Sequence, residues 1–200
     1  MNSARDPGPG RCAPALSTAG DDWVRTLAAM LRDAQARAGG RRVMAVEGRS
    51  GAGKTELAGR VAAHIGCPLL HMDDVYPGWQ GLEASVPLVR EWILEPLARG
   101  EDPRWRRYDW ERGAPGPWQR TPVEGLLVIE GCGSGGRELR PFLSLLAWVH
   151  APHDVRQARL DRRADAAAYA PYRSMWARQE EAFYAGHRPR EHADVVVHNP

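Results

Sequence analysis

The sequence has 200 residues, enough for one domain with a substantial core, and its formal net charge of +2 at pH 7 does not indicate a nucleic acid partner. Its three cysteines are widely spaced, which excludes a disulfide framework and a zinc-binding pattern and fits a cytoplasmic protein. No apolar run approaches the roughly 18 residues of a membrane span, so we expect no membrane partner.

The beginning of the chain is expected to differ from the rest. Residues 1–20 are rich in Pro, Gly and Ser, which predicts a disordered lead-in, and residues 21–200 are expected to form a single domain. Asp21 or Asp22 is expected to cap a first helix that ends at residues 39–40, where two glycines follow each other.

Apolar runs and helical spacing alternate along the remaining chain. Buried strands are predicted at residues 42–48, 67–74, 125–131, 143–151 and 193–199. Helices are predicted at residues 54–65, 87–99 with a start near Ser85, about 152–165 and about 172–184. Residues 101–122 show no clear period and are expected to be a long irregular connection. The alternation predicts an α/β fold, a parallel five-stranded sheet with helices on both faces in three layers.

The 27 lysine and arginine residues include a single lysine, Lys54, which lies in the segment Gly-Arg-Ser-Gly-Ala-Gly-Lys-Thr at residues 48–55. The segment fits G-x-x-x-x-G-K-[ST], the P-loop or Walker A motif, between a predicted strand and a predicted helix. Glycines let backbone N–H groups surround phosphate oxygens, and a compact ammonium fits where a planar guanidinium does not. We therefore predict that the phosphates of ATP are bound by Gly48, Ser50, Gly51, Ala52, Gly53, Lys54 and Thr55.

Carboxylates follow two of the predicted strands. Glu130 ends one, and Asp73 and Asp74 end another, so the shared edge of a parallel sheet should bring them near the P-loop. The Thr55 hydroxyl and Glu130, directly or through water, are predicted to hold Mg²⁺. Asp73 is predicted to orient an acceptor hydroxyl and take its proton. The alternatives are an ordinary strand-end carboxylate at Glu130 and a turn at the aspartates.

Arginines gather in the predicted helix near residues 152–165. Arg156, Arg159, Arg162 and Arg163 recur at spacings of three and four, so they share much of one helical face. They are expected to form an Arg-rich lid, in which Arg159 and Arg163 neutralise phosphoryl charge and Arg162 contacts the acceptor. The alternative is a solvated helix with arginine–aspartate pairs. Residues 104–113 mix Trp and Arg, so they could bind a planar or anionic acceptor or form an amphipathic surface loop.

The chain resembles the uridine kinase-like branch of the P-loop kinases in the segments GRSGAGKT, HMDDVY, YDW, VIEG, DVRQARLDRRAD and ADVVV, in order over roughly residues 41–198. The resemblance implies that Asp73 is the general base and that Tyr76 contacts the substrate. It also implies that Tyr108 and Asp109 belong to the acceptor site. Glu130 is similar to the Walker B glutamate of that family.

The resemblance and the motifs together predict a kinase that uses ATP and Mg²⁺ to phosphorylate a hydroxyl of a small molecule. A nucleoside such as uridine or cytidine is the first expected acceptor. Residues 78–92 lack the aspartates that members of that family carry there, so two alternatives stay open. One is a kinase for another metabolite or an antibiotic hydroxyl, and the other is a nucleotide-dependent regulatory ATPase.

Overall fold

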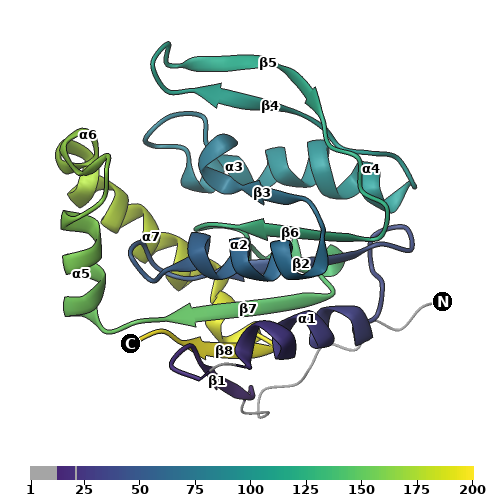
Figure 1. Cartoon of the computed structure of the whole chain (residues 1–200). Helices are drawn as coiled ribbons and strands as arrows, with labels where there is room; N and C mark the ends of the chain where they lie inside the picture. The colour runs from purple at the N-terminus through teal and green to yellow at the C-terminus, as the bar shows by residue number, and fades with distance from the viewer. Residues whose placement is uncertain (1–12, 21) are drawn as a thin grey trace.

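The computed structural model describes residues 13–20 and 22–200 and contains a six-stranded, entirely parallel sheet with helices around it (Figure 1). The strands in their order across the sheet are β1 (Ala15–Ser17), β8 (Val195–His198), β7 (Leu145–His150), β2 (Arg42–Glu47), β6 (Leu126–Glu130) and β3 (Leu69–His71). The prediction of a parallel α/β sheet is confirmed. The predicted number of strands, five, is wrong, because β1 adds a sixth.

Strand β1 lies inside the predicted lead-in. Val196 N–H donates to Pro14 O at 3.0 Å and Thr18 N–H donates to His198 O at 2.9 Å, so this segment completes the edge of the sheet next to β8. A strand of three residues is too short to show a period of two, which is why the sequence pattern did not indicate it. The rest of the predicted lead-in, residues 1–12, lies outside the described residues. So does Asp21, one of the two predicted capping residues.

Alternating residues of the central strand β2 point into two separate cores. Val43 and Ala45 pack into the core that α3 (Leu82–Val89) and α7 (Arg173–His187) complete. Met44 and Val46 pack into the core that α1 (Trp23–Asp33) and α2 (Lys54–Ile65) complete. Both faces of the sheet are therefore covered by helices, as a parallel sheet requires.

The predicted helices are present with changed boundaries. Helix α1 ends earlier than predicted, and the helix predicted at 87–99 begins at Leu82, continues through a π-helical segment (Arg90–Leu94) and ends with α4 (Glu95–Ala98). Pro87 lies inside that helix rather than at its start. The other helices are α5 (His153–Asp161) and α6 (Ala166–Tyr169), with short 3₁₀ turns at Met72–Asp74, Arg140–Phe142, Ala170–Tyr172 and Pro189–His192. In the described part of the chain, no helix is long and apolar enough to cross a membrane.

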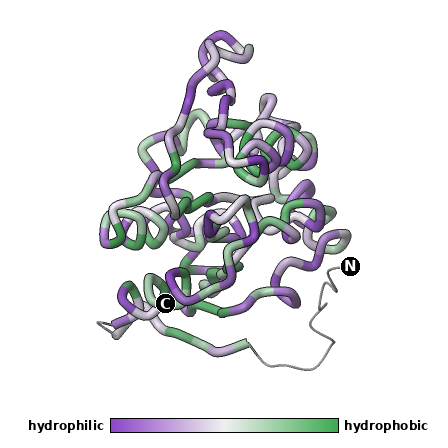
Figure 2. Tube along the Cα trace, turned by 90° about the vertical axis from the view of Figure 1, so that its right-hand side faces the viewer, coloured by the Kyte–Doolittle hydropathy of each residue, from purple (hydrophilic) through white to green (hydrophobic). Residues whose placement is uncertain are grey.

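The segment predicted to be irregular, 101–122, is instead a β-hairpin. Strands β4 (Arg104–Asp109) and β5 (Ala114–Arg120) pair antiparallel with each other, with a register shift between Arg106 and Tyr108. Figure 2 shows the hairpin projecting at the top of the molecule and hydrophilic over most of its length. Pro and Gly residues inside β5 hide the strand pattern in the sequence, and an edge strand tolerates them.

Candidate active site

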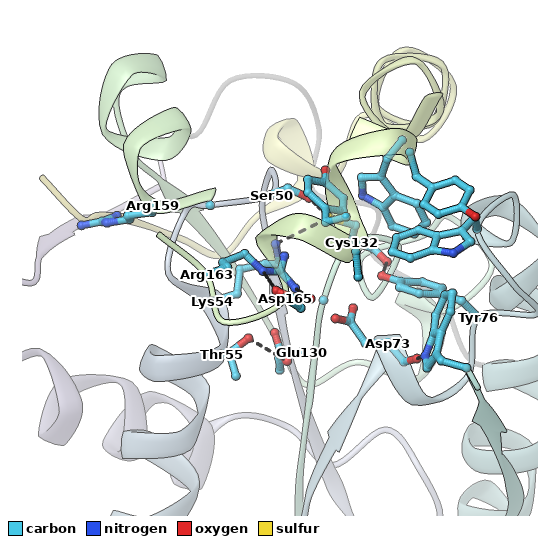
Figure 3. A pocket seen from close by; sticks show the side chains of 18 of the residues that line it. Ser50, Lys54, Thr55, Asp73, Tyr76, Glu130, Cys132, Arg159, Arg163 and Asp165 are labelled. Carbon is cyan, nitrogen blue, oxygen red and sulfur yellow. Dashed lines mark hydrogen bonds and ion pairs between the residues drawn. The ribbon is translucent and has the colours of Figure 1, made fainter. Parts of the chain in front are cut away.

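The carboxyl ends of three adjacent strands meet at one edge of the sheet. Strand β6 pairs with β2 and β3, with Glu130 opposite Val46 on one side and His71 on the other. The P-loop follows β2 at this edge, and the turn Met72–Asp74 follows β3. A cavity of about 1110 Å³ opens here, and residues from the P-loop, β6 and the α5–α7 segment line it (Figure 3). The arrangement predicted from the strand ends is thus present.

The P-loop has the geometry that its glycines allow. Gly51 and Gly53 have φ angles of +79° and +92°, in the region that favours glycine. A Cβ on Gly51 would lie 2.5 Å from Arg156 O, so the loop also approaches the backbone of α5 closely. Lys54 is the first residue of α2, and the backbone N–H groups therefore lie at a helix N-terminus, which favours anions.

The Lys54 side chain bends into the protein. Its Nζ donates to Arg49 O at 3.2 Å and lies 3.5 Å from Cys132 Sγ, and the residue is 8% exposed. Burial opposes the charged form of Lys54. The nearby negative groups outweigh burial and raise the pKa of Lys54, and they include the carboxylates of Glu130 and Glu180. The ammonium therefore stays charged in the cavity.

Oxygen atoms suited to Mg²⁺ lie next to the lysine. Thr55 Oγ1 donates to Glu130 Oε1 at 3.1 Å, and His71 Nδ1 lies 2.6 Å from the same Oε1 (Figure 3 draws the first of these bonds). The hydrogen bond to Glu130 is the main reason that the pKa of His71 is raised. Within residues 13–20 and 22–200, no group of three or more His, Cys, Asp and Glu side chains could hold a metal. A hydroxyl and one carboxylate fit Mg²⁺, which takes its other ligands from water and phosphates.

The two adjacent aspartates have different surroundings. Asp74 pairs with Arg107 of the hairpin, Nε to Oδ1 at 2.8 Å, whereas Asp73 lines the cavity. Asp73 is exposed to the cavity, and the protein groups around its carboxyl partly desolvate it. This desolvation, together with the charge of Glu130, raises the pKa of Asp73. Of the two adjacent aspartates, Asp73 is therefore the one that faces the cavity.

The predicted lid and acceptor residues are divided between the cavity and the surface. Arg159 and Arg163 line the cavity, and so does Tyr76, whose hydroxyl donates to Cys132 O at 2.7 Å. Three predicted acceptor residues are not among the described residues that line the cavity: Tyr108, Asp109 and Arg162. The residues that follow them in the hairpin, Trp110 and Glu111, line it instead.

The lining arginines are held by protein groups. Arg159 donates to Ala52 O at 3.4 Å and to Pro200 O at 3.0 Å, so it joins α5 to the P-loop and the end of the chain. Arg163 makes two bonds of 2.8 Å to the Asp165 carboxylate. Both side chains are therefore fixed near the phosphate site by neighbouring residues.

Glu47, which sequence reasoning missed, anchors the loops around the site. Its fully buried carboxylate accepts hydrogen bonds from the backbone N–H of Gly48 at 3.0 Å and from those of Gly133 and Gly135 at 2.8 Å. It also accepts an O–H hydrogen bond from the Tyr184 hydroxyl at 3.2 Å. Burial raises its pKa to about 7, although these hydrogen bonds act in the opposite direction. The sequence contained one signal for this residue, because β2 and β6 each end at a glutamate that is followed by a glycine.

Glu180 of α7 is a second missed residue. Its Oε1 accepts from Ser50 N–H at 2.9 Å and from Ser50 Oγ at 2.5 Å, and lies 3.3 Å from Cys132 Sγ. The residue is 3% exposed. In the sequence it sits beside Glu181 in an ordinary helical stretch, so no local pattern could have indicated this contact.

Aromatic rings form the other side of the cavity. Trp79 and Tyr172 are stacked at 4.2 Å with an interplanar angle of 10°, and the rings of Trp79 and Trp110 are 4.9 Å apart. We call five of the six lining rings, all except Tyr76, the aromatic wall: Trp79, Trp110, Tyr169, Tyr172 and Trp176. In Figure 3, ring side chains gather beside Tyr76, on the side of Asp73 away from Thr55 and Glu130. Trp79 and Trp176, which lie outside the Trp- and Arg-rich segment 104–113, therefore also border the cavity.

A second cavity of about 250 Å³ lies on the outer side of the P-loop. It shares Gly53, Glu56 and Arg159 with the large cavity. At its rim, Asn199 Nδ2 donates to Ala52 O at 2.8 Å, and Thr18 Oγ1 donates to Asn199 Oδ1 at 2.7 Å. Thr18, which directly follows β1, and Asn199, near the end of the chain, thus lie beside the P-loop.

The sequence matches no family model and no curated protein. The fold is similar to solved structures. One, described as a possible uridine kinase from Bacillus stearothermophilus, has a TM-score of 0.65 and 19% identity and covers 88% of this chain and 97% of its own. Another, provisionally described as a fructose transport system kinase from Silicibacter sp. TM1040, has a TM-score of 0.51 and 19% identity over 86% and 98% of the two chains. At these identities the comparison shows a shared fold and nothing more.

Proposed function

We propose that the protein is a small-molecule kinase that transfers the γ-phosphoryl group of ATP to a hydroxyl acceptor with the help of Mg²⁺. The observation that carries the proposal is that Lys54 and Thr55 of the P-loop, Glu130 of β6 and Asp73 after β3 all border one cavity. A phosphate site, a metal site and a proton acceptor are the parts that phosphoryl transfer to a hydroxyl needs.

The P-loop side of the cavity is suited to the phosphates. Backbone N–H groups of the P-loop and the Lys54 ammonium would bind phosphate oxygens, and Thr55 and Glu130 would hold Mg²⁺. Mg²⁺, when bound, supplies positive charge that offsets the charge on the phosphates. The nucleoside part of ATP would bind in the smaller cavity, because Gly53 and Arg159 border both cavities.

Asp73 and the two lid arginines would act on the reacting groups. Asp73 accepts the proton of the acceptor hydroxyl, whose oxygen forms a bond to the γ-phosphorus as the bond to ADP breaks. Arg159 and Arg163 stabilise the charge on the transferred group. Contacts of Tyr76, Tyr108, Asp109 and Arg162 with the acceptor, and a nucleoside as that acceptor, stay predictions from the sequence.

The test is Mg²⁺-dependent release of ADP from ATP in the presence of uridine, cytidine, other nucleosides, sugars, hydroxy acids and amino alcohols. Asp73→Asn should abolish the stimulation by an acceptor and keep nucleotide binding, and Lys54→Ala should lose nucleotide binding. Asp74→Asn is the matched control, because its carboxylate pairs with Arg107 outside the cavity lining. Turnover that no acceptor stimulates, or equal losses in both aspartate variants, would contradict the proposal.

A further inference from the structure

The half of the cavity beyond Asp73 is built from rings of four separate segments. Trp79 follows β3, Trp110 is at the tip of the hairpin, Tyr169 and Tyr172 lie in the α6 region, and Trp176 is in α7. Trp110 and Tyr172 are 39% and 37% exposed, so these large rings are not buried in the core. Side chains with large apolar area left open beside a catalytic carboxylate indicate a surface for a ligand.

The positive groups of the cavity lining are each held by a protein group. Lys54 is bonded to Arg49 O, Arg159 to Ala52 O, and Arg163 to the Asp165 carboxylate. Figure 3 shows the three side chains on the P-loop side of Asp73, with Tyr76 and most of the unlabelled rings on the opposite side. In the described lining, the acceptor half, the part of the cavity beyond Asp73, therefore has one neighbouring arginine, Arg163, which contacts Tyr169 and is paired with Asp165.

Negative groups are present in the acceptor half. The carboxylates of Asp73 and Glu111 line the cavity, and Glu111 directly follows Trp110 of the aromatic wall in the chain. The nearby hairpin arginines are paired with other carboxylates, Arg107 with Asp74 at 2.8 Å and Arg112 with Asp109 at 3.5 Å. An anionic acceptor would thus meet like charges and the negative faces of rings, whereas a cation would be attracted by both.

The aromatic wall already holds one cation. The Arg163 guanidinium lies 5.3 Å from the centre of the Tyr169 ring, within the range of a cation–π contact. The rings of Trp79, Trp110 and Tyr172 contact one another in a continuous group next to it. These rings offer further faces of the same kind to a ligand.

We propose that the acceptor of this kinase is an alcohol that carries a positive charge, a protonated amine or a quaternary ammonium, and that its charged group binds between the aromatic wall and Glu111. The inference rests on the proposed function and names its substrate class. The acceptor oxygen attacks the γ-phosphorus, the bond from that phosphorus to the β-phosphate oxygen breaks, Asp73 takes the hydroxyl proton, and ADP leaves. The cationic group takes no part in these bonds and fixes the position of the hydroxyl.

Pairs of alcohols that differ only in charge test the inference. One pair is choline and 3,3-dimethylbutan-1-ol, and a larger pair is benzyl(2-hydroxyethyl)dimethylammonium and 3,3-dimethyl-4-phenylbutan-1-ol. Calorimetry in the presence of Mg²⁺ and a non-hydrolysable ATP analogue gives the dissociation constants, and tryptophan fluorescence reports contact with the wall. We expect the ammonium member of a pair to bind roughly tenfold more tightly than its neutral partner.

Variants connect the preference to the named residues. Glu111→Gln and Trp110→Leu should each reduce the preference for the charged alcohol and leave the affinity for the ATP analogue unchanged. Glu124→Gln, an exposed glutamate outside the cavity lining, is the matched control and should behave as the native protein does.

The affinity for the ATP analogue separates the two ways of failing. Equal or weaker binding of the ammonium member, or no binding of either member, with the analogue still bound, would overturn this inference alone. A native protein that does not bind the analogue would overturn the proposed function.

Discussion

Replacing Gly51 by alanine tests whether the P-loop depends on its close approach to α5. At its φ of +79° an L side chain is strained by about 1 kcal/mol or more. The new Cβ would lie 2.5 Å from Arg156 O and 3.0 Å from Arg156 C and Cα, where ordinary contact begins at 3.4 Å. Because backbone of a helix must move, overpacking adds about 1–3 kcal/mol. The expected loss in free energy of unfolding is therefore about 2–4 kcal/mol.

Urea unfolding followed by tryptophan fluorescence measures that loss, and calorimetry with ADP and Mg²⁺ measures the effect on the phosphate site. Gly59→Ala is the matched control, since it makes the same change inside α2, where nothing lies within 4 Å of the new Cβ. It should stabilise the protein by about 0.5–1 kcal/mol. The reasoning would be refuted if the Gly51→Ala variant had the same midpoint of urea unfolding as the native protein and bound ADP with the same affinity.

Three other predictions concern charge and hydrogen bonding in the site. Lys54→Arg keeps the charge but should weaken ADP binding by about tenfold or more in calorimetry, because a guanidinium does not fit the loop. In the proposed reaction the ionised form of Asp73 is the base, and burial raises its pKa, so kcat should fall as the pH decreases, with a midpoint above the ordinary aspartate value of 3.8. Asp73→Asn should lower kcat by about 10²–10⁴-fold and remove this acid limb. Glu180→Ala leaves Ser50 N–H without its acceptor and should cost about 1–3 kcal/mol in urea unfolding, whereas a native midpoint would contradict that contact.

The elements with strong local patterns could be predicted from the sequence. The strand before the P-loop, the helix that starts at Lys54 and the later apolar runs all carry periods or motifs that physical chemistry can interpret. The edge strand Ala15–Ser17 could not be predicted, because its stability comes from hydrogen bonds to β8, at the other end of the chain. The hairpin strand Ala114–Arg120 was missed since Pro115, Gly116 and Pro117 hide its alternation.

The candidate site shows the same division. Glu130 and Asp73 could be placed together because the ends of parallel strands share one edge, and the structure has both at one cavity. Glu180 could not be placed, since it bonds to a residue 130 positions away and lies in a helix whose pattern gives no sign of it. No local pattern distinguishes the rings of Trp79 and Trp176, and only the tertiary fold puts them beside a cavity.

The P-loop is the part of the site that local sequence describes best, yet its backbone is held by segments far along the chain. Arg156 of α5 donates to Ser50 O at 3.1 Å, Glu180 of α7 accepts from Ser50 N–H, and Asn199 donates to Ala52 O. Helix α7 also carries a ring of the aromatic wall. A change in the phosphate loop therefore acts on the helices that border the acceptor half, and a glycine motif alone does not determine the shape of the loop. For this reason the Gly51→Ala strain should appear in both global stability and ligand affinity.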